Sequence, residues 1–439
     1  MEKMEKFEKN LSFLEVVWLA ALALAPLDAV LLLPYKVGGF SLSVVRLLVL
    51  AAIALSLLML AARGRVRVVR GNLVLGAYLM WLGWNVASGL WAVSELVYMR
   101  YLSLTVIYSA LVVFVLQVSR SPRKYDLLLK AVWLVVLTTV AFGILELISG
   151  YRVPASRQWA FRNEIVSLFI NPSHFGGALA MFAPFVVMYP IWSPRRSFLL
   201  VVTAAALLAL VGYLVVRSGS RGAVLGLLLG CGVAVAFSLF RRVRRSLVML
   251  AAVSASFVLV VIGLEIGLPL PEALSSKLNT LWDPVSLLAG ETRKVLWQIG
   301  WQFWMESPVV GWGAGASEYL MMERASWLPA YSLHGWGIEI LINTGLIGAV
   351  LWTVFVLTVV SGLLRHLWRS DSWHTCFVAS SLLGGMAASA AIAFTVGSLI
   401  TFPLFWVHLG LCAALASRRV RGESKLMLTH AGRRKGQSI

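Results

Sequence analysis

The chain has 439 residues, of which 60% are hydrophobic and only 13% are charged. A globular protein has about 45–50% apolar and about 25% charged residues, so this composition excludes an ordinary soluble protein. The apolar residues form long blocks of about 18–25 residues, the length that spans a bilayer, and no hydrophilic block is long enough to be a soluble domain. We therefore expect residues 1–439 to form a single all-α domain embedded in a membrane.

The apolar blocks predict about twelve transmembrane helices. The first block resembles a signal peptide, but its apolar run continues to Leu33 and glutamates precede it, so we expect an uncleaved anchor. The three cysteines lie inside apolar runs without motif spacing, so they indicate neither a disulfide framework nor a metal cluster. The expected spans cover residues 11–33, 42–62, 72–91, 101–118, 125–149, 172–191, 198–216, 222–240, 247–268, 336–364, 376–394 and 400–416.

The distribution of basic residues predicts the orientation. With a cytoplasmic N-terminus, 25 of the 38 Lys and Arg residues fall on the cytoplasmic side, twelve fall on the outer side and Lys130 lies within a span. Inward loops carry the excess of Lys and Arg, so we expect both termini in the cytoplasm. The net charge of +19 then mostly reflects contact with anionic inner-leaflet lipid. We interpret the basic tail after Arg418 in the same way, in preference to RNA binding.

The outer cations are unevenly distributed. Four of them, Lys36, Arg46, Arg100 and Lys277, are typical of snorkelling or loop cations. The other eight lie in three adjoining outer segments: Arg152, Arg157 and Arg162; Arg217 and Arg221; and Arg293, Lys294 and Arg324. Arginine in three adjoining segments favours a shared anion site over separate contacts with lipid headgroups.

The short segment Arg217-Ser-Gly-Ser-Arg221-Gly joins the seventh and eighth spans. The eighth span runs inward, so its free N–H groups and its positive dipole end face the outer boundary. Ser220 can cap this helix, and Arg221 can offer two parallel N–H groups to a phosphate. The alternative is a tight turn with one interfacial arginine.

The longest outer segment, residues 269–335, contains a predicted amphipathic helix from Ser286 to Ser307, which Pro308 ends. Arg293, Trp297 and Trp301 are four residues apart and share one face. Tryptophan favours the membrane interface, so we expect this helix to lie there as a strap and to cover the site as a lid.

Two further helix openings face the same side. His334 stands at the outer mouth of the tenth span, among small neighbours, and its ordinary pKa of about 6.5 suits proton transfer. Asn171 and Pro172 open the sixth span, where we expect an N-cap and a first helical position. His174 follows one turn later.

These elements resemble the O-antigen ligase and polymerase superfamily of membrane glycosyltransferases. The resemblance runs from about Asn171 to Gly348, and the span count extends it over the whole chain. The matching motifs are Asn171-Pro172, Ser220-Arg221-Gly222, Arg293 and Trp297 before Pro308-Val-Val-Gly311-Trp-Gly313, and His334 before Gly345-Leu-Ile-Gly348. The chain departs from the family pattern where Gly335 replaces an asparagine and where Asn343-Thr344 replaces an acidic residue.

The resemblance implies a GT-C-like enzyme that transfers a glycan from undecaprenyl diphosphate to an acceptor, lipid A-core for a ligase, with inversion. Arg221 and Arg293 would stabilise the leaving diphosphate, and His334 would take or orient the acceptor proton. Glu291 and Glu306 are reserve bases. Candidate diphosphate- or substrate-binding residues are Arg157, Arg162, Asn171, His174, Arg217, Ser220 and Trp297. The outer loops contain no Asp-x-Asp motif, so we expect neither a metal nor another cofactor.

The implied location is the bacterial inner membrane, with the site facing the periplasm or the outside. Three alternatives stay open. A polymerase that joins O-antigen, teichuronic-acid or exopolysaccharide repeat units shares the superfamily. A transporter would show charged or broken helices near the bilayer midplane and internal repeats, and neither is clear in this chain. A non-catalytic scaffold would leave the clustered arginines unexplained.

Overall fold

A computed structural model describes most of the chain. The residues described are 13–28, 31–37, 40–63, 72–119, 121–153, 164–169, 171–195, 197–265, 291–327, 332–394 and 398–418. Within them, eight helices are long and apolar enough to cross a membrane, and three apolar helices are shorter. The chain is therefore a multi-pass membrane protein.

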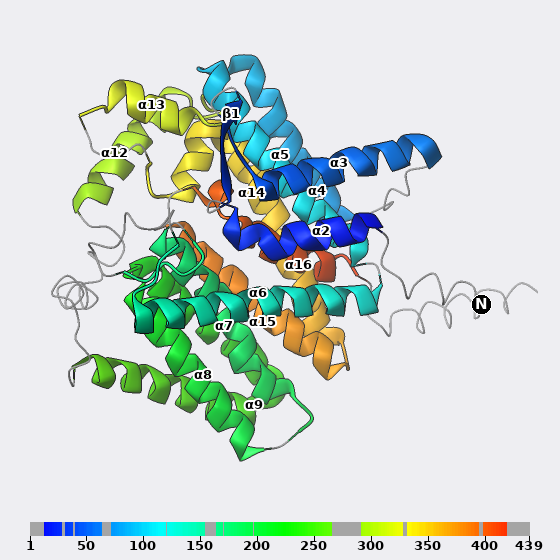
Figure 1. Ribbon diagram of the computed structural model, residues 1–439, viewed down its shortest axis with the longest axis vertical. Helices are drawn as coiled ribbons and strands as arrows, with labels where there is room; N and C mark the ends of the chain where they lie inside the picture. The colour runs from blue at the N-terminus through cyan, green and yellow to red at the C-terminus, as the bar shows by residue number, and fades with distance from the viewer. Residues whose placement is uncertain are drawn as a thin grey trace, which may run out of the picture.

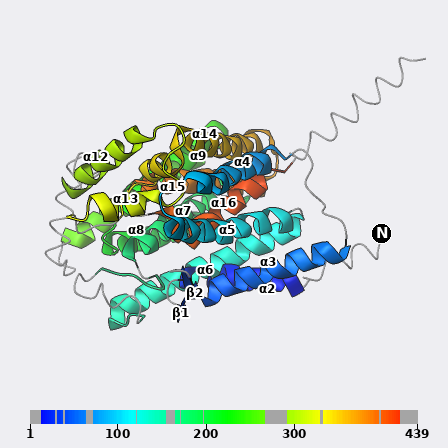
Figure 2. The ribbon, with the colours of Figure 1, turned by 90° about the horizontal axis from the view of Figure 1, so that it is seen from above.

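The helices follow the apolar blocks of the sequence. The eight candidate spans lie in α4 (Leu73–Ala87) with η2 (Ser88–Trp91), α5 (Glu95–Val118), α6 (Pro122–Ser149), α7 (Pro172–Trp192), α8 (Phe198–Arg217), α9 (Arg221–Glu265), α14 (Trp336–Arg369) and α15 (Trp373–Ala393). The shorter apolar helices lie in α2 (Phe13–Leu24), α3 (Val44–Arg63) and α16 (Pro403–Ala416), which η5 (Leu399–Thr401) precedes. The long helices lie side by side (Figure 2).

Twelve spans were expected and eight candidates are found, because three expected spans fall in the shorter apolar helices α2, α3 and α16 and two fall in α9. α9 covers two of the expected spans, because its backbone breaks only at Arg242 (φ −142°, ψ 46°) and the helix continues beyond it. The first expected span, residues 11–33, is helical only to Leu24. η1 (Ala25–Leu27) follows, and Pro26 lacks the N–H that an α-helix needs there.

The all-α expectation is confirmed for the bundle, and one short β-hairpin accompanies the helices in the described residues. β1 (Leu32–Val37) pairs antiparallel with β2 (Phe40–Ser43). Asp28 anchors this region, because its carboxylate accepts hydrogen bonds from Arg46 at 2.9 Å and from the hydroxyl of Tyr108 on α5 at 2.7 Å. The prediction that Arg46 is an ordinary loop or snorkelling cation is therefore wrong, since a buried carboxylate holds it.

The centre of the bundle is built from α7, α9, α15 and α16, and every residue of α16 is buried. Small residues allow the central helices to approach closely. A Cβ atom at Gly384 would lie 2.5 Å from the carbonyl oxygen of Gly230. Such contacts are typical of helix pairs in membranes, where close packing replaces the hydrophobic effect between helices.

Two further helices, α12 (Glu291–Glu306) and α13 (Ala316–Arg324), lie together at one end of the bundle (Figure 1). They enclose a second small core with the start of α14, made of Leu296, Phe303, Leu320, Met321, Leu333 and Ile342 among others. α12 confirms the helix predicted before Pro308 over residues 291–306. Residues 286–290 lie outside the described residues.

Candidate functional site

The turn between α8 and α9 brings two of the predicted arginines to one end of the bundle. Arg217 ends α8 and Arg221 begins α9. Gly219 adopts φ 65°, which glycine tolerates without strain. The Ser220 hydroxyl accepts a hydrogen bond from the backbone N–H of Ala223 at 3.3 Å, so the predicted cap is present. The N-terminus of α9 therefore opens beside Arg221.

Neighbouring elements hold this turn in place. A Cβ atom at Gly176 on α7 would lie 2.5 Å from the Ser218 hydroxyl, so α7 touches the turn directly. The backbone N–H of Ile165 donates to the carbonyl oxygen of Arg217 at 3.1 Å. The Nε atom of Arg217 is buried and has no hydrogen-bond partner among the described residues. Packing from two sides fixes where the arginines emerge.

α12 carries Arg293 and Trp297 over the start of α14. Leu296 and Phe303 are buried beneath the helix, whereas Trp301 is half exposed. The Trp297 indole packs against Gly335, where an added Cβ atom would lie 3.0 Å from its Nε1 atom. This contact is a physical reason for glycine at position 335, since the Cβ atom of an asparagine would require the Trp297 indole to shift by a few tenths of an ångström. The indole N–H itself has no hydrogen-bond partner in the described part of the chain.

His334 has an unusual backbone conformation. Its φ is +49°, in the left-handed region that few residues other than glycine adopt. Its N–H donates to the Ser332 hydroxyl at 3.3 Å, and α14 begins two residues later. Such strain persists only where the surrounding structure imposes it, and it is concentrated at functional sites. No feature of the sequence pattern predicts this conformation.

Electrostatic effects join His334 to the two arginines. Burial, and then the positive charge of Arg293, lowers the pKa of His334 below its ordinary 6.5. Burial, and then the charge of Arg221, lowers the pKa of Arg293, which nevertheless stays charged near neutrality. Groups on α9, α12 and the entry to α14 therefore lie within electrostatic range of one another. The arrangement combines two cations with a histidine that is neutral and able to accept a proton.

The other predicted site residues are placed differently. Asn171 caps α7, because its side-chain oxygen accepts from the Ser173 N–H at 2.8 Å, and Pro172 occupies the first turn as predicted. The His174 ring stacks on Phe402 with centroids 4.8 Å apart, so it takes part in packing. Arg157 and Arg162 lie outside the described residues.

The reserve bases are also constrained. Glu306 pairs with Arg324 at 2.6 Å, and both side chains are about half exposed. Glu291 begins α12, and its side chain is not among those that the structure describes. Among the residues that the structure describes, no group of three or more His, Cys, Asp or Glu side chains is placed to hold a metal ion. The expectation that arginines act without a metal stays a prediction.

Sequence reasoning missed a contact between α14 and the segment that follows α12. The backbone of α14 breaks at Gly345 (φ 64°, ψ −168°), and the Pro308–Gly311 segment docks against the break. The N–H groups of Leu346 and Ile347 donate to the carbonyl oxygens of Pro308 and Val309 at 2.9 and 3.2 Å. The signal was present in the two glycine motifs, but the pairing between them is a long-range contact.

A second missed contact fixes the loop beside Arg217. The Glu146 carboxylate accepts from the N–H groups of Val166 and Ser167 at 3.0 and 2.7 Å and pairs with Arg152 at 3.1 Å. Arg152, counted by sequence among the outer arginines, therefore binds a carboxylate at the end of α6.

The fold defines a polytopic membrane protein whose cationic cluster lies at one end of the helices. Residues 206–353 match the family model described as O-Antigen ligase. The match includes Arg221, Arg293 and His334. The chain is also 23% identical over 397 residues to the teichuronic acid biosynthesis protein TuaE of Bacillus subtilis (strain 168). The matched region covers 86% of this chain and 79% of that protein.

Proposed function

We propose that this protein is a membrane glycosyltransferase that moves a glycan from undecaprenyl diphosphate to an acceptor, as an O-antigen ligase acts on lipid A-core. The observation that carries the proposal is the grouping of Arg221, Arg293 and His334 from three separate elements at one end of the bundle. All three lie within the residues that match the O-antigen ligase family model, and that family implies lipid-linked glycan substrates.

The residues suggest a direct displacement. The acceptor hydroxyl oxygen attacks the anomeric carbon, and the bond from that carbon to the diphosphate oxygen breaks. The diphosphate leaves with the bonding electrons, and Arg221 and Arg293 stabilise its developing charge. His334, kept neutral by burial and by Arg293, takes the acceptor proton. One displacement inverts the configuration at the anomeric carbon.

The other predicted residues have supporting places in this proposal. Ser220 and Arg217 present the helix end that would receive a phosphate oxygen. The Trp297 N–H faces the same entry to α14 and would contact the sugar or the diphosphate. We place this site on the outer face of a bacterial inner membrane, with both termini in the cytoplasm, and residues 269–335 as the outer segment that covers it.

The arginines provide the first test. A planar fork binds two phosphate oxygens at once, which lysine cannot do, so Arg221→Lys and Arg293→Lys should each lose most of the transfer activity. Arg324→Lys is the matched control, because Arg324 is half exposed and pairs with Glu306. The assay measures glycan transfer from an undecaprenyl-diphosphate donor in nanodiscs. Near-normal turnover in both site variants, with folding retained, would reject the diphosphate site.

A polymerase is the second candidate, and the similarity to a teichuronic acid biosynthesis protein over most of the chain favours it. The two reactions share the donor and differ in the acceptor. Lipid-linked repeat units and lipid A-core should therefore be offered in the same assay. Longer chains on the lipid carrier indicate a polymerase, whereas glycan joined to lipid A-core indicates a ligase.

A further inference from the structure

A second basic cluster lies at the opposite end of the helices from His334. Arg242, Arg244 and Arg245 lie close together in sequence at the break in α9, and Arg195 lies in the connection from α7 to α8. About twenty residues of helix separate Arg221 from Arg242, which corresponds to about 30 Å at 1.5 Å per residue. This is the thickness of a bilayer core, so the two clusters lie at opposite membrane boundaries.

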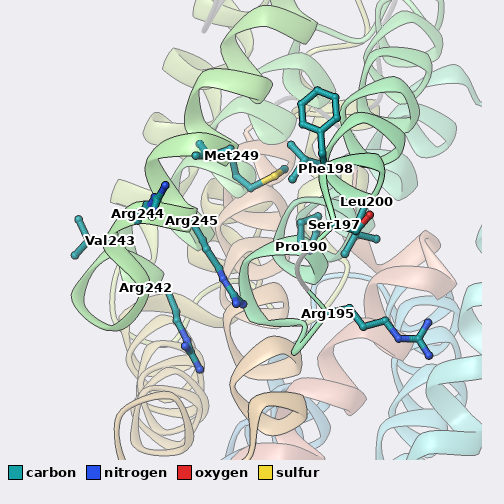
Figure 3. A pocket seen from close by; sticks show the side chains of 12 residues that line it. Pro190, Arg195, Ser197, Phe198, Leu200, Arg242, Val243, Arg244, Arg245 and Met249 are labelled. Carbon is teal, nitrogen blue, oxygen red and sulfur yellow. The ribbon is translucent and has the colours of Figure 1, made fainter.

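These arginines surround a cavity of about 630 Å³. Its lining is divided, because Phe198 and Met249 contribute apolar surface on one side. The side chains of Arg242 and Arg245 extend away from that apolar side, as Figure 3 shows. None of the described residues that line the cavity is acidic. The cavity therefore combines a basic part with an apolar wall.

Local contacts hold the basic side chains in position. Arg245 Nη1 donates to the carbonyl oxygens of Ile191 and Ser193, at 3.1 and 2.7 Å, at the C-terminal end of α7. The Arg242 guanidinium stands 5.6 Å from the centre of the Trp192 ring. The non-helical backbone of Arg242 turns α9 at this point, so three arginines near one another in sequence gather around one cavity.

We propose that this cavity binds an anionic phospholipid, with the phosphate among the arginines and an acyl chain along Phe198 and Met249. Arginine forms paired hydrogen bonds to phosphate oxygens, and basic pockets at a membrane boundary select anionic headgroups. The apolar wall distinguishes this ligand from a soluble phosphate, which would gain nothing from it. The proposal does not depend on the transfer reaction, because the site lies at the other end of the molecule.

The test measures lipid binding to the purified full chain by native mass spectrometry. Phosphatidylglycerol should bind more tightly than phosphatidylcholine, and Arg242→Gln/Arg244→Gln should weaken that binding by about tenfold through lost charge-assisted hydrogen bonds. Arg365→Gln/Arg369→Gln is the control, because it removes the same charge from the end of α14. An equal loss in both double variants, or no preference for phosphatidylglycerol, would overturn the proposal.

A second arm separates a lipid from a soluble anion. Phe198 is 84% exposed, so Phe198→Ser should leave folding intact while it removes part of the apolar wall. We expect Phe198→Ser to weaken the binding of phosphatidylglycerol without changing the binding of glycerol phosphate. Full displacement of the lipid by glycerol phosphate or inorganic phosphate, or unchanged lipid binding in Phe198→Ser, would show that no acyl chain is recognised.

Discussion

His334 combines a strained backbone with a lowered side-chain pKa. Its φ of +49° turns the side chain at the entry to α14, and burial together with Arg293 lowers its pKa. The imidazole therefore stays neutral near pH 7 and can accept a proton. A histidine used only for interfacial hydrogen bonding would need neither feature.

Loss of the imidazole should slow the chemical step specifically. We expect His334→Ala to reduce single-turnover glycan transfer by about 10²–10⁴-fold, the usual contribution of a general base. Donor affinity, measured separately, should survive because the arginines bind the diphosphate. Weaker donor binding with an unchanged chemical step would instead make His334 a binding residue.

Transfer should also persist in excess chelator. A rate that is lost in chelator and restored by magnesium would contradict the metal-free mechanism.

The pH dependence follows from the direction of the pKa shift. A lowered pKa favours the neutral base, so transfer is retained above that pKa and lost as the pH falls through it, below 6.5. Arg293→Gln removes the second cause of the shift, so the pKa of His334 should rise. Carbon-13 NMR of labelled histidine measures the pKa of His334 without an activity assay. The chain has only six histidines, and His334→Gln identifies the signal. Arg324→Gln is the control. If the pKa of His334 is unchanged in Arg293→Gln, then the charge of Arg293 does not act on His334.

Local patterns predicted two helix caps near the candidate site. The cap at Ser220 and the cap at Asn171 depend on neighbouring backbone groups, so sequence is sufficient for both. The role of Arg152 could not be predicted this way, because its partner Glu146 lies on the preceding helix beside a loop fixed by the same carboxylate. Outer sidedness alone does not distinguish a structural arginine from a ligand-binding one.

At the scale of elements, the support of α14 depends on two glycine motifs that meet in space. An added Cβ atom at Gly345 would lie 2.2 Å from the Val309 carbonyl oxygen, and one at Gly311 would lie 2.5 Å from the Gly345 nitrogen. The hydrogen bonds that a broken helix leaves open are completed by the segment after α12. Single-sequence periodicity predicts an unbroken span here because the apolar pattern continues through the break.

Two of the glycines in α14, Gly345 and Gly337, offer a matched comparison. Gly345→Ala places a side chain at φ 64° against backbone, so we expect a loss of at least about 2 kcal/mol in stability. Gly337 is exposed with nothing near an added Cβ atom, and Gly337→Ala should be neutral or stabilising by up to about 1 kcal/mol. Thermal unfolding in detergent measures both. Equal melting temperatures would mean that the docking of residues 308–311 contributes little.

Helix positions were predictable for a simple reason. Each long span is an apolar run ended by polar or basic residues, and both features are local. The start of the chain was mispredicted because Pro26 ends the helix inside an apolar run, and the β1–β2 hairpin continues that run without helical structure. Hydropathy cannot distinguish those two conformations.

For the whole molecule, basic residues at the end opposite His334 also stabilise helix ends. Arg241 Nη1 donates to the carbonyl oxygens of Leu367 and Ser370, both at 2.8 Å, at the end of α14. Arg418 donates through Nε to the Ser119 carbonyl oxygen at 3.0 Å, just past α5. Cations complement the negative ends of helices, so the same residues that predict orientation also hold several helices together there.

The orientation itself can be tested with one thiol at each end. Glu323 on α13 and Asp371 after α14 are both exposed acidic residues, and the three native cysteines are buried. The proposed orientation puts the basic end in the cytoplasm. In intact cells, a membrane-impermeant maleimide should then label Glu323→Cys and should reach Asp371→Cys only after permeabilisation. A reporter fused after Arg418 should score as cytoplasmic, and one inserted near Ser276 as external. Labelling of Asp371→Cys from outside would reverse the molecule and place the His334 cluster away from an outer-leaflet donor.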